Sequence, residues 1–121
     1  SLPSRGLGDV YKRQAEIPCK KIYEDNFVLS FYDINPQKKI HALVIPKGPY
    51  EDLDDFSKNA SSEEMVGLLR GINIVAKKLK ISVDTGKGYR ALTNISEYGG
   101  QEVPHLHFHL FGGERVGKMV E

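Results

Sequence analysis

The stretch HLHFHLFGG, residues 105–113, holds three of the four histidines of this 121-residue chain. The histidines occupy every second position, and the residues between them are apolar. In a β-strand, residues two apart share a face. The alternation therefore predicts a last strand with an open face of imidazoles and an opposite face packed into the core. The imidazole face comprises His105, His107 and His109, and the apolar face comprises Leu106, Phe108 and Leu110.

This histidine row has three possible interpretations: a solvated polar face, a metal site or a site for phosphoryl chemistry. Strict spacing beside a glycine-rich loop speaks against a chance polar face. A metal ion is the second interpretation, because imidazole is a common zinc ligand. However, the outer two histidines of such a strand lie about 13 Å apart. Zinc–nitrogen bonds of about 2 Å do not span that distance without distortion, and only His41 would complete a set.

Phosphoryl chemistry accounts for both the row and the loop that precedes it. A neutral imidazole attacks phosphorus if its far nitrogen is held as a donor. Neighbouring imidazoles, together with backbone N–H groups of the loop 99–102, would hold the phosphate oxygens. We therefore favour this interpretation over the other two.

Around the histidine row, the pattern predicts one main helix among strands. The segment 27–32 alternates, with Phe27, Leu29 and Phe31 on one side, after a turn at 24–26. The run HALVIP (41–46) is typical of a central strand, and 89–95 predicts another, followed by a loop to residue 104. Between them, 47–60 predicts a loop with one helical turn near 52–56. The order favours an α+β domain with an antiparallel sheet.

The helix is expected over 62–80, because Ser61 and Glu64 form a capping-box sequence. Its apolar positions recur at helical spacing and indicate a core-facing stripe. Gly67 and Gly71 lower its helix propensity, which we interpret as a hint that a partner's backbone packs closely against it. The stripe comprises Met65, Leu68, Leu69, Ile72, Val75, Ala76 and Leu79.

Composition excludes several classes of protein. The formal net charge is +1, so no basic surface for nucleic acid is expected. The apolar runs fall short of the roughly 20 residues that a membrane span requires. The single cysteine, Cys19, fits a reducing compartment. We therefore expect a cytoplasmic protein that binds neither nucleic acid nor membrane.

The motifs together resemble the histidine triad (HIT) superfamily. HLHFHLF matches its His-φ-His-φ-His-φ-φ signature, in which φ is apolar. The trailing Gly112-Gly113, the loop GGQEV, and the segments EIPCKKIYED and FYDINPQKKIHALVIPK are similar to its HINT-like branch. The similarity covers residues 15–113.

The resemblance implies a HIT-like fold, with a five-stranded antiparallel sheet and one long helix, in which two protomers join their sheets as a homodimer. It implies hydrolysis of purine nucleoside phosphoramidates, such as adenosine 5′-monophosphoramidate, through a nucleotidyl-histidine intermediate and without a metal or other cofactor. Two alternatives remain: a dinucleoside polyphosphate hydrolase and a non-catalytic nucleotide-binding module.

The catalytic roles that the resemblance implies fall on all four histidines. His107 resembles the nucleophile. His109 and His105 resemble the histidines that support the phosphate, and His41 resembles a buried histidine that orients them.

The implied nucleotide-binding residues lie in two other segments and in the histidine row itself. Asp33 resembles the carboxylate that holds the ribose hydroxyls, and an ionised carboxylate suits a vicinal diol. Ile34 would lie against the base. The contacts to phosphate and leaving group are expected from Asn94, Gly100, Gln101, Glu102, His107 and His109.

Two departures from the family pattern are visible. Residues 1–14, which end in DVYKRQ, replace an apolar segment that often carries two cysteines. We expect them to be a non-native or disordered tail, with the HIT domain at 15–121, a poorer base pocket and no zinc site of that kind. Glu102 stands where some members have serine near the leaving group.

Overall fold

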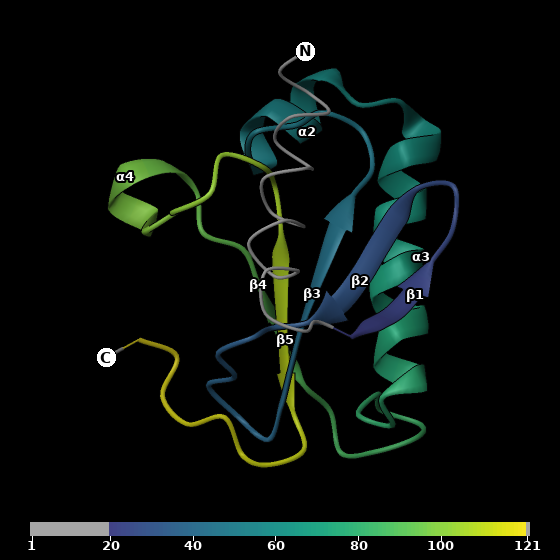
Figure 1. Cartoon of the computed structure of the whole chain (residues 1–121), viewed down its shortest axis with the longest axis vertical. Helices are drawn as coiled ribbons and strands as arrows, with labels where there is room; N and C mark the ends of the chain where they lie inside the picture. Colours follow the sequence, from purple (N-terminus) through teal and green to yellow (C-terminus); the bar gives the residue numbers. More distant parts are fainter. Residues whose placement is uncertain (1–19, 121) are drawn as a thin grey trace.

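The computed structural model describes residues 20–120, which form a five-stranded sheet with helices on one face (Figure 1). The expected tail at 1–14 and Cys19 lie outside the described residues. All strand pairs are antiparallel, in the order β1-β2-β3-β5-β4, which confirms the predicted fold class. The strands are β1 (Lys21–Glu24), β2 (Val28–Tyr32), β3 (Ile40–Pro46), β4 (Arg90–Leu92) and β5 (Phe108–Gly112).

The two central strands β2 and β3 are buried on both faces. Val28 of β2 packs with Val44 of β3 in a cluster that also includes residues of the helices. On the other face, Phe31 packs with Leu43 and Ile45. The predicted alternation holds from Val28 onward, and both faces of β2 are buried. Phe27 precedes the strand and contacts α3 at Gly67, so it does not share a side with Leu29 and Phe31 as predicted.

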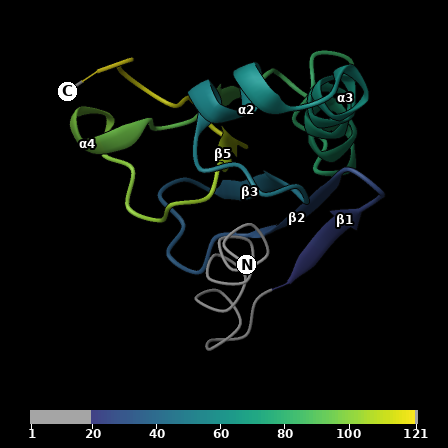
Figure 2. The ribbon, with the colours of Figure 1, turned by 90° about the horizontal axis from the view of Figure 1, so that it is seen from above.

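The long helix is α3 (Ser62–Lys78), and its capping box between Ser61 and Glu64 is formed as predicted. Figure 2 shows α3 in a layer on one face of the sheet together with α2 (Leu53–Asn59). Leu68, Ile72 and Val75 of the apolar stripe are buried. Leu69 is an exception, with 67% of its surface exposed, because it turns away from the sheet.

Gly67 and Gly71 face the chain's own sheet. A Cβ at Gly67 would lie 2.5 Å from the ring of Phe27, and one at Gly71 would lie 2.8 Å from a methyl of Val28. Because Cβ contacts under 3.0 Å are essentially never seen, the two glycines allow side chains of the β2 region to approach the helix. These contacts explain the glycines without a partner's backbone.

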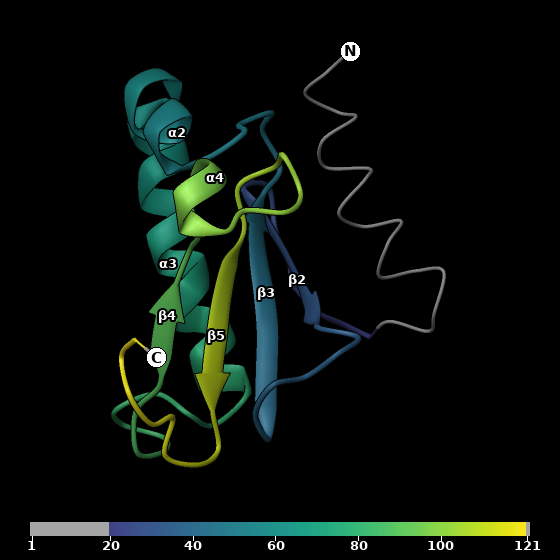
Figure 3. The ribbon, with the colours of Figure 1, turned by 90° about the vertical axis from the view of Figure 1, so that its left-hand side faces the viewer.

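Three connections differ in detail from expectation. The turn near 52–56 extends into α2, which is capped by the side chain of Asp52. The strand expected at 89–95 is shorter and comprises β4 only. The loop before the histidine row contains a short helix, α4 (Ser96–Gly99), near the start of β5 (Figure 3). Among the described residues, no helix has the length and apolar character needed to cross a membrane.

The last strand is shorter than predicted and does not include all three histidines. β5 begins at Phe108, so His105 and His107 precede the strand. The backbone turns at Val103, whose carbonyl accepts the N–H of His105 at 2.8 Å, and Leu106 donates its N–H to the carbonyl of Tyr50 at 2.8 Å. Because these bonds take the chain out of the sheet, His105 is not part of an open row. It is 1% exposed.

Candidate functional site

A pocket of about 490 Å³ lies where the β2–β3 connection meets the segment between β4 and β5. It brings together seven of the ten residues predicted for the site. His41, His105 and Gln101 are not in its lining, whereas Asn35, Leu43 and Val103 are lining residues that the sequence did not indicate. The predicted residues in the lining are Asp33, Ile34, Asn94, Gly100, Glu102, His107 and His109.

A larger cleft of about 880 Å³ lies elsewhere, between residues 80–90 and 113–117. No histidine lines it. The smaller pocket is therefore the candidate site, because it alone of the two is lined by imidazoles, which can serve as nucleophile, donor or acceptor.

His107 is held through one ring nitrogen, while the other has no hydrogen bond or ion pair to any of residues 20–120. Its Nδ1 lies 2.7 Å from the carbonyl oxygen of His105. A carbonyl only accepts, so Nδ1 carries the proton and the neutral ring has its lone pair on Nε2. The hydroxyl of Thr93 donates to the carbonyl of His107 at 2.7 Å, which anchors the same residue from β4's side. His107 therefore presents an unshared electron pair from a fixed backbone.

His105 is buried, and it orients His107 through its main-chain carbonyl. Its Nε2 donates to the carbonyl of Pro46 at 3.0 Å. Burial lowers its pKa, although that hydrogen bond opposes the shift. The ring is thus a neutral packing element, and its main-chain carbonyl is what orients His107.

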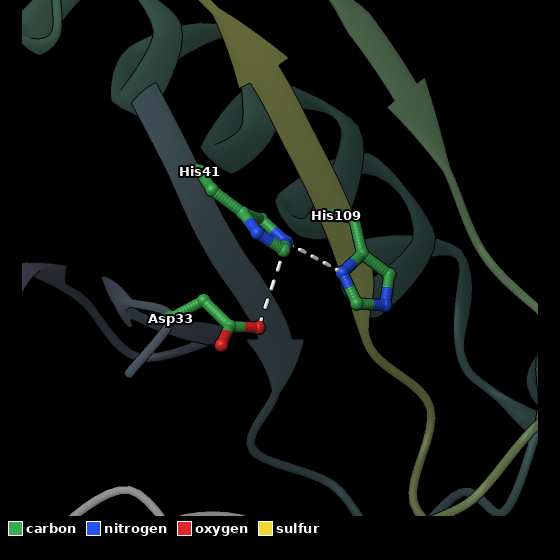
Figure 4. Close-up of side chains that lie close together, drawn as sticks. All are labelled: Asp33, His41 and His109. Atoms are coloured by element: carbon green, nitrogen blue, oxygen red, sulfur yellow. Dashed lines mark hydrogen bonds and ion pairs between the residues drawn. The ribbon is translucent and has the colours of Figure 1, made fainter. Parts of the chain in front are cut away.

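Hydrogen bonds fix the tautomers of His41 and His109, and Figure 4 shows His41 between His109 and Asp33. The N–H of Gln37 donates to Nδ1 of His41 at 3.1 Å, so the proton of the neutral His41 ring must be on Nε2. That Nε2 lies 2.9 Å from Nδ1 of His109. His109 therefore accepts through Nδ1 and keeps its own proton on Nε2. This pattern makes His109 a hydrogen-bond donor beside His107, with the two ring centroids 5.1 Å apart.

The surroundings keep these rings neutral. Burial lowers the pKa of His109 to about 4, and charge on His107 and His41 would add to this effect. Burial also lowers the pKa of His41, although the nearby carboxylate of Asp33 partly opposes it. Neutral rings can donate and accept in the fixed pattern above, whereas charged rings could only donate.

Asp33 is half-buried at the edge of the pocket. Its Oδ2 lies 3.5 Å from Nε2 of His41, and its Oδ1 accepts the N–H of Asn35 at 2.8 Å. The carboxylate is thus positioned at the pocket wall by the turn that follows β2.

Asp33, His41 and His109 offer ligand atoms within 4.8 Å of one another, a spacing that suits one metal ion. This set differs from the one considered for the histidine row. Its His41 atom near the other two ligands is Nε2, and the hydrogen bond from Gln37 places the proton there. A protonated nitrogen has no lone pair for a metal. The hydrogen-bond pattern therefore disfavours an ion at this cluster.

Gln101 lies near the pocket without lining it. Its side-chain amide donates to the carbonyls of Glu51 at 2.5 Å and Val103 at 3.1 Å, and it accepts the N–H of Ser96 at 3.0 Å. Because these three bonds occupy the amide, the geometry gives this side chain a role in holding the loop and does not support the predicted direct contact with a nucleotide.

The site combines a lone pair on His107, a donor on His109 and flanking carboxylates. Such a set suits attack on an electrophilic phosphorus whose oxygens are held by N–H donors. No signal in the sequence indicated Thr93, because its bond to His107 joins residues 14 apart. Gln37 lies only four residues before His41, but no motif indicates that its N–H meets the ring.

Comparisons with known proteins agree with this geometry. The model of the family described as "HIT domain" matches residues 14–116. A HIT-like protein of Azospirillum brasilense is 50% identical over 107 residues, which cover 88% of this chain and 85% of that protein. A purine nucleoside phosphoramidase of Escherichia coli is 39% identical over 105 residues, which cover 87% of this chain and 85% of that protein.

A solved structure is similar as well. The solved structure of a HIT family hydrolase from Clostridium thermocellum superposes with a TM-score of 0.76 at 35% identity, and the match covers 95% of both chains. The similarity therefore extends over nearly the whole of both chains.

Proposed function

The chain belongs to the HIT domain family, and on that premise we propose that it is a hydrolase of purine nucleoside phosphoramidates, which releases a nucleoside monophosphate and an amine. The observation that carries the proposal is the free Nε2 of His107 in a pocket, held by the bond from Nδ1 to the carbonyl of His105. The phosphoramidase among the relatives supports this substrate class.

In the first step, Nε2 of His107 donates its electron pair to phosphorus. The new N–P bond forms as the P–N bond of the substrate breaks, and the leaving nitrogen keeps that electron pair and takes one proton from solvent. The imidazole becomes cationic, with its Nδ1 proton still bonded to the carbonyl of His105. His109 donates from Nε2 to a phosphate oxygen, where negative charge develops.

In the second step, a water oxygen attacks phosphorus. The bond between phosphorus and Nε2 of His107 breaks, and the electron pair returns to the ring. The water loses one proton to solvent, and the monophosphate departs. The sum is one phosphoramidate and one water converted to one monophosphate and one amine.

The pocket walls suit a nucleotide. Ile34 and Leu43 offer apolar surface for a base beside the carboxylate of Asp33, which would accept the ribose hydroxyls. Asn94 and the backbone at Gly100 lie on the other segment of the lining, toward the phosphate and leaving group. The N–H of Gly100 donates to the carbonyl of Glu97 at 3.1 Å, and the φ of +80° at Gly100 turns the chain so that the N–H of Gln101 donates to the carbonyl of Ser96 at 3.0 Å. These two N–H groups are therefore bonded within the loop, contrary to the expectation that they hold phosphate oxygens.

The test is incubation with adenosine 5′-monophosphoramidate, with detection of the monophosphate. We expect turnover by the wild type and none by His107→Ala, and acid-quenched mass spectrometry should show a nucleotidyl adduct only in the wild type. Unfolding curves for both proteins check that the variant is folded. A His107→Ala variant that still turns over would contradict the nucleophile assignment.

The same assay separates the alternatives. Nucleotide binding without hydrolysis would favour a non-catalytic binding module. Preferred cleavage of a dinucleoside polyphosphate would favour the other hydrolase class.

We also propose that the protein is a homodimer in solution. The support is the family resemblance together with β4, which lies at the edge of the sheet and pairs only with β5 among the described strands. An edge strand leaves backbone groups available for pairing with a second copy. Light scattering at micromolar concentration should give twice the mass of 13.6 kDa.

A further inference from the structure

We infer that Glu102 makes this pocket select leaving groups that carry a positive charge, so that phosphoramidates of diamines are cleaved in preference to those of amino acids with a free carboxylate. The inference rests on the proposed function. It names the class of amine that the site would release.

The charge of the pocket lining is the first observation. Two carboxylates, Asp33 and Glu102, line it, whereas no lysine or arginine is among its lining residues. The two histidines add no positive charge while they are neutral. Since fixed charges of one sign raise the local concentration of the opposite sign, the pocket favours a cation and repels a second anion beside the phosphate.

The two carboxylates differ in availability. Asp33 already accepts the N–H of Asn35 and lies beside His41. Glu102 is exposed, and its carboxylate has no hydrogen bond or ion pair with any residue in the range 20–120. Glu102 is therefore the carboxylate that is free to meet a ligand.

The geometry of attack places the leaving group near Glu102. In an in-line displacement, the leaving nitrogen lies on the far side of phosphorus from Nε2 of His107. With the nucleoside against Asp33 and Ile34, the remaining lining segment is the one that includes Gly100 and Glu102. An ammonium group a few bonds beyond the leaving nitrogen would thus come within range of the Glu102 carboxylate.

The backbone that carries Glu102 is fixed on both sides. Gln101 ties the loop to Glu51 and to Val103, and it holds the N–H of Ser96. Gly100 closes the preceding helix α4. The charge is therefore presented from a held segment, which makes a defined preference possible.

The experiment uses three adenosine phosphoramidates whose leaving amines share one alkyl chain and end in an ammonium, a methyl or a carboxylate group. For the wild type we expect the highest kcat/KM with the ammonium and the lowest with the carboxylate. Glu102→Gln should lower the ratio of the ammonium to the carboxylate substrate by about tenfold, the size expected for one solvated charge pair. Glu102→Lys should reverse the order.

Glu97→Gln is the matched control, because it removes one negative charge from an exposed position in α4 that does not line the pocket. Its ratio should equal that of the wild type. Added salt should compress the wild-type preference and leave that of Glu102→Gln nearly unchanged. Equal ratios for the wild type and Glu102→Gln would overturn the inference.

A titration of the same three compounds into His107→Ala separates this inference from the proposed function. If the wild type hydrolyses none of them but His107→Ala binds the ammonium compound most tightly, the charge selection stands and the hydrolase proposal falls. If the methyl compound is hydrolysed and binding shows no charge preference, the hydrolase proposal stands and the charge selection falls.

Discussion

The Nε2 of His41 lies 2.9 Å from the Nδ1 of His109, and the opposite nitrogen of His41 accepts the N–H of Gln37. One backbone donor in the β2–β3 connection therefore determines which nitrogen of a ring on another strand carries a proton. The effect reaches the pocket, because His109 lines it and His41 does not.

The four ring tautomers can be measured directly. We expect His41, His105 and His109 to be protonated on Nε2 and His107 on Nδ1, because of their respective carbonyl, imidazole and N–H partners. Long-range ¹H–¹⁵N correlation spectra at pH 7.5 distinguish the two forms. An Nδ1 proton on His41 would contradict the hydrogen-bond pattern from Gln37 through His41 to His109. It would also leave on Nε2 of His41 the lone pair that a metal requires.

Thr93→Val is expected to slow turnover. The hydroxyl of Thr93 donates to the carbonyl of His107 at 2.7 Å, and valine keeps the shape without the donor. A small displacement of the nucleophile should lower kcat by about tenfold with little change in KM. Thr93→Ser keeps the donor and is the control. A Thr93→Val enzyme with wild-type kcat would show that this bond does not position His107.

Stability should fall as the pH is lowered from about 6.5 toward 4. The unfolded chain binds a proton at each histidine below 6.5, whereas the folded pKa of His109 is lowered to about 4. Protonation therefore favours the unfolded state through this window. For His109 alone the loss is about 3 kcal/mol over the full range, because each pKa unit corresponds to about 1.4 kcal/mol. Urea unfolding at a series of pH values measures it.

His109→Asn is the control for this pH dependence. It should reduce the slope of the unfolding free energy between pH 6 and 5 by about 1 kcal/mol per unit. The pKa values of His41 and His105 are also lowered, so these two residues account for the pH dependence of the unfolding free energy that remains in the variant. An unchanged slope in the variant would mean that His109 is not protected from protonation in the folded state.

Ser30→Ala should stabilise the fold. Ser30 is fully buried, and its hydroxyl finds no hydrogen-bond partner among residues 20–120. Removal of an unsatisfied buried hydroxyl should raise the free energy of unfolding by about 1 kcal/mol. Ser82 is the matched contrast, since it is 1% exposed but bonds to Asp84 at 2.6 Å. Ser82→Ala should destabilise by a similar amount, and both differences are measured by urea unfolding.

The elements that the sequence predicted well have local causes. The helix start at Ser62 follows from a capping box within four residues. The turn before β2 follows from Asp25, whose carboxylate accepts the N–H groups of Phe27 and Val28. Such contacts lie within a few residues, so the local pattern contains them.

The histidine row shows where local pattern fails. Alternation alone extends the strand back to His105, but the carbonyl of Tyr50 draws Leu106 out of the sheet from a distant part of the chain. The same limit hides Leu43, which lines the pocket because the register of β3 and β5 pairs it with His109. The motif therefore predicted which histidines gather, and tertiary contacts determined their individual directions.

The burial of β3 on both faces affects how activity is lost in denaturant. Strands buried on both faces exchange their amide protons only when the whole domain opens, whereas segments outside the sheet open locally at lower cost. His41 lies in β3, whereas His107 lies outside the sheet, just before β5. The hydrogen bond between His41 and His109 should therefore persist under conditions that displace His107, and mild denaturant should abolish activity reversibly before the main unfolding transition.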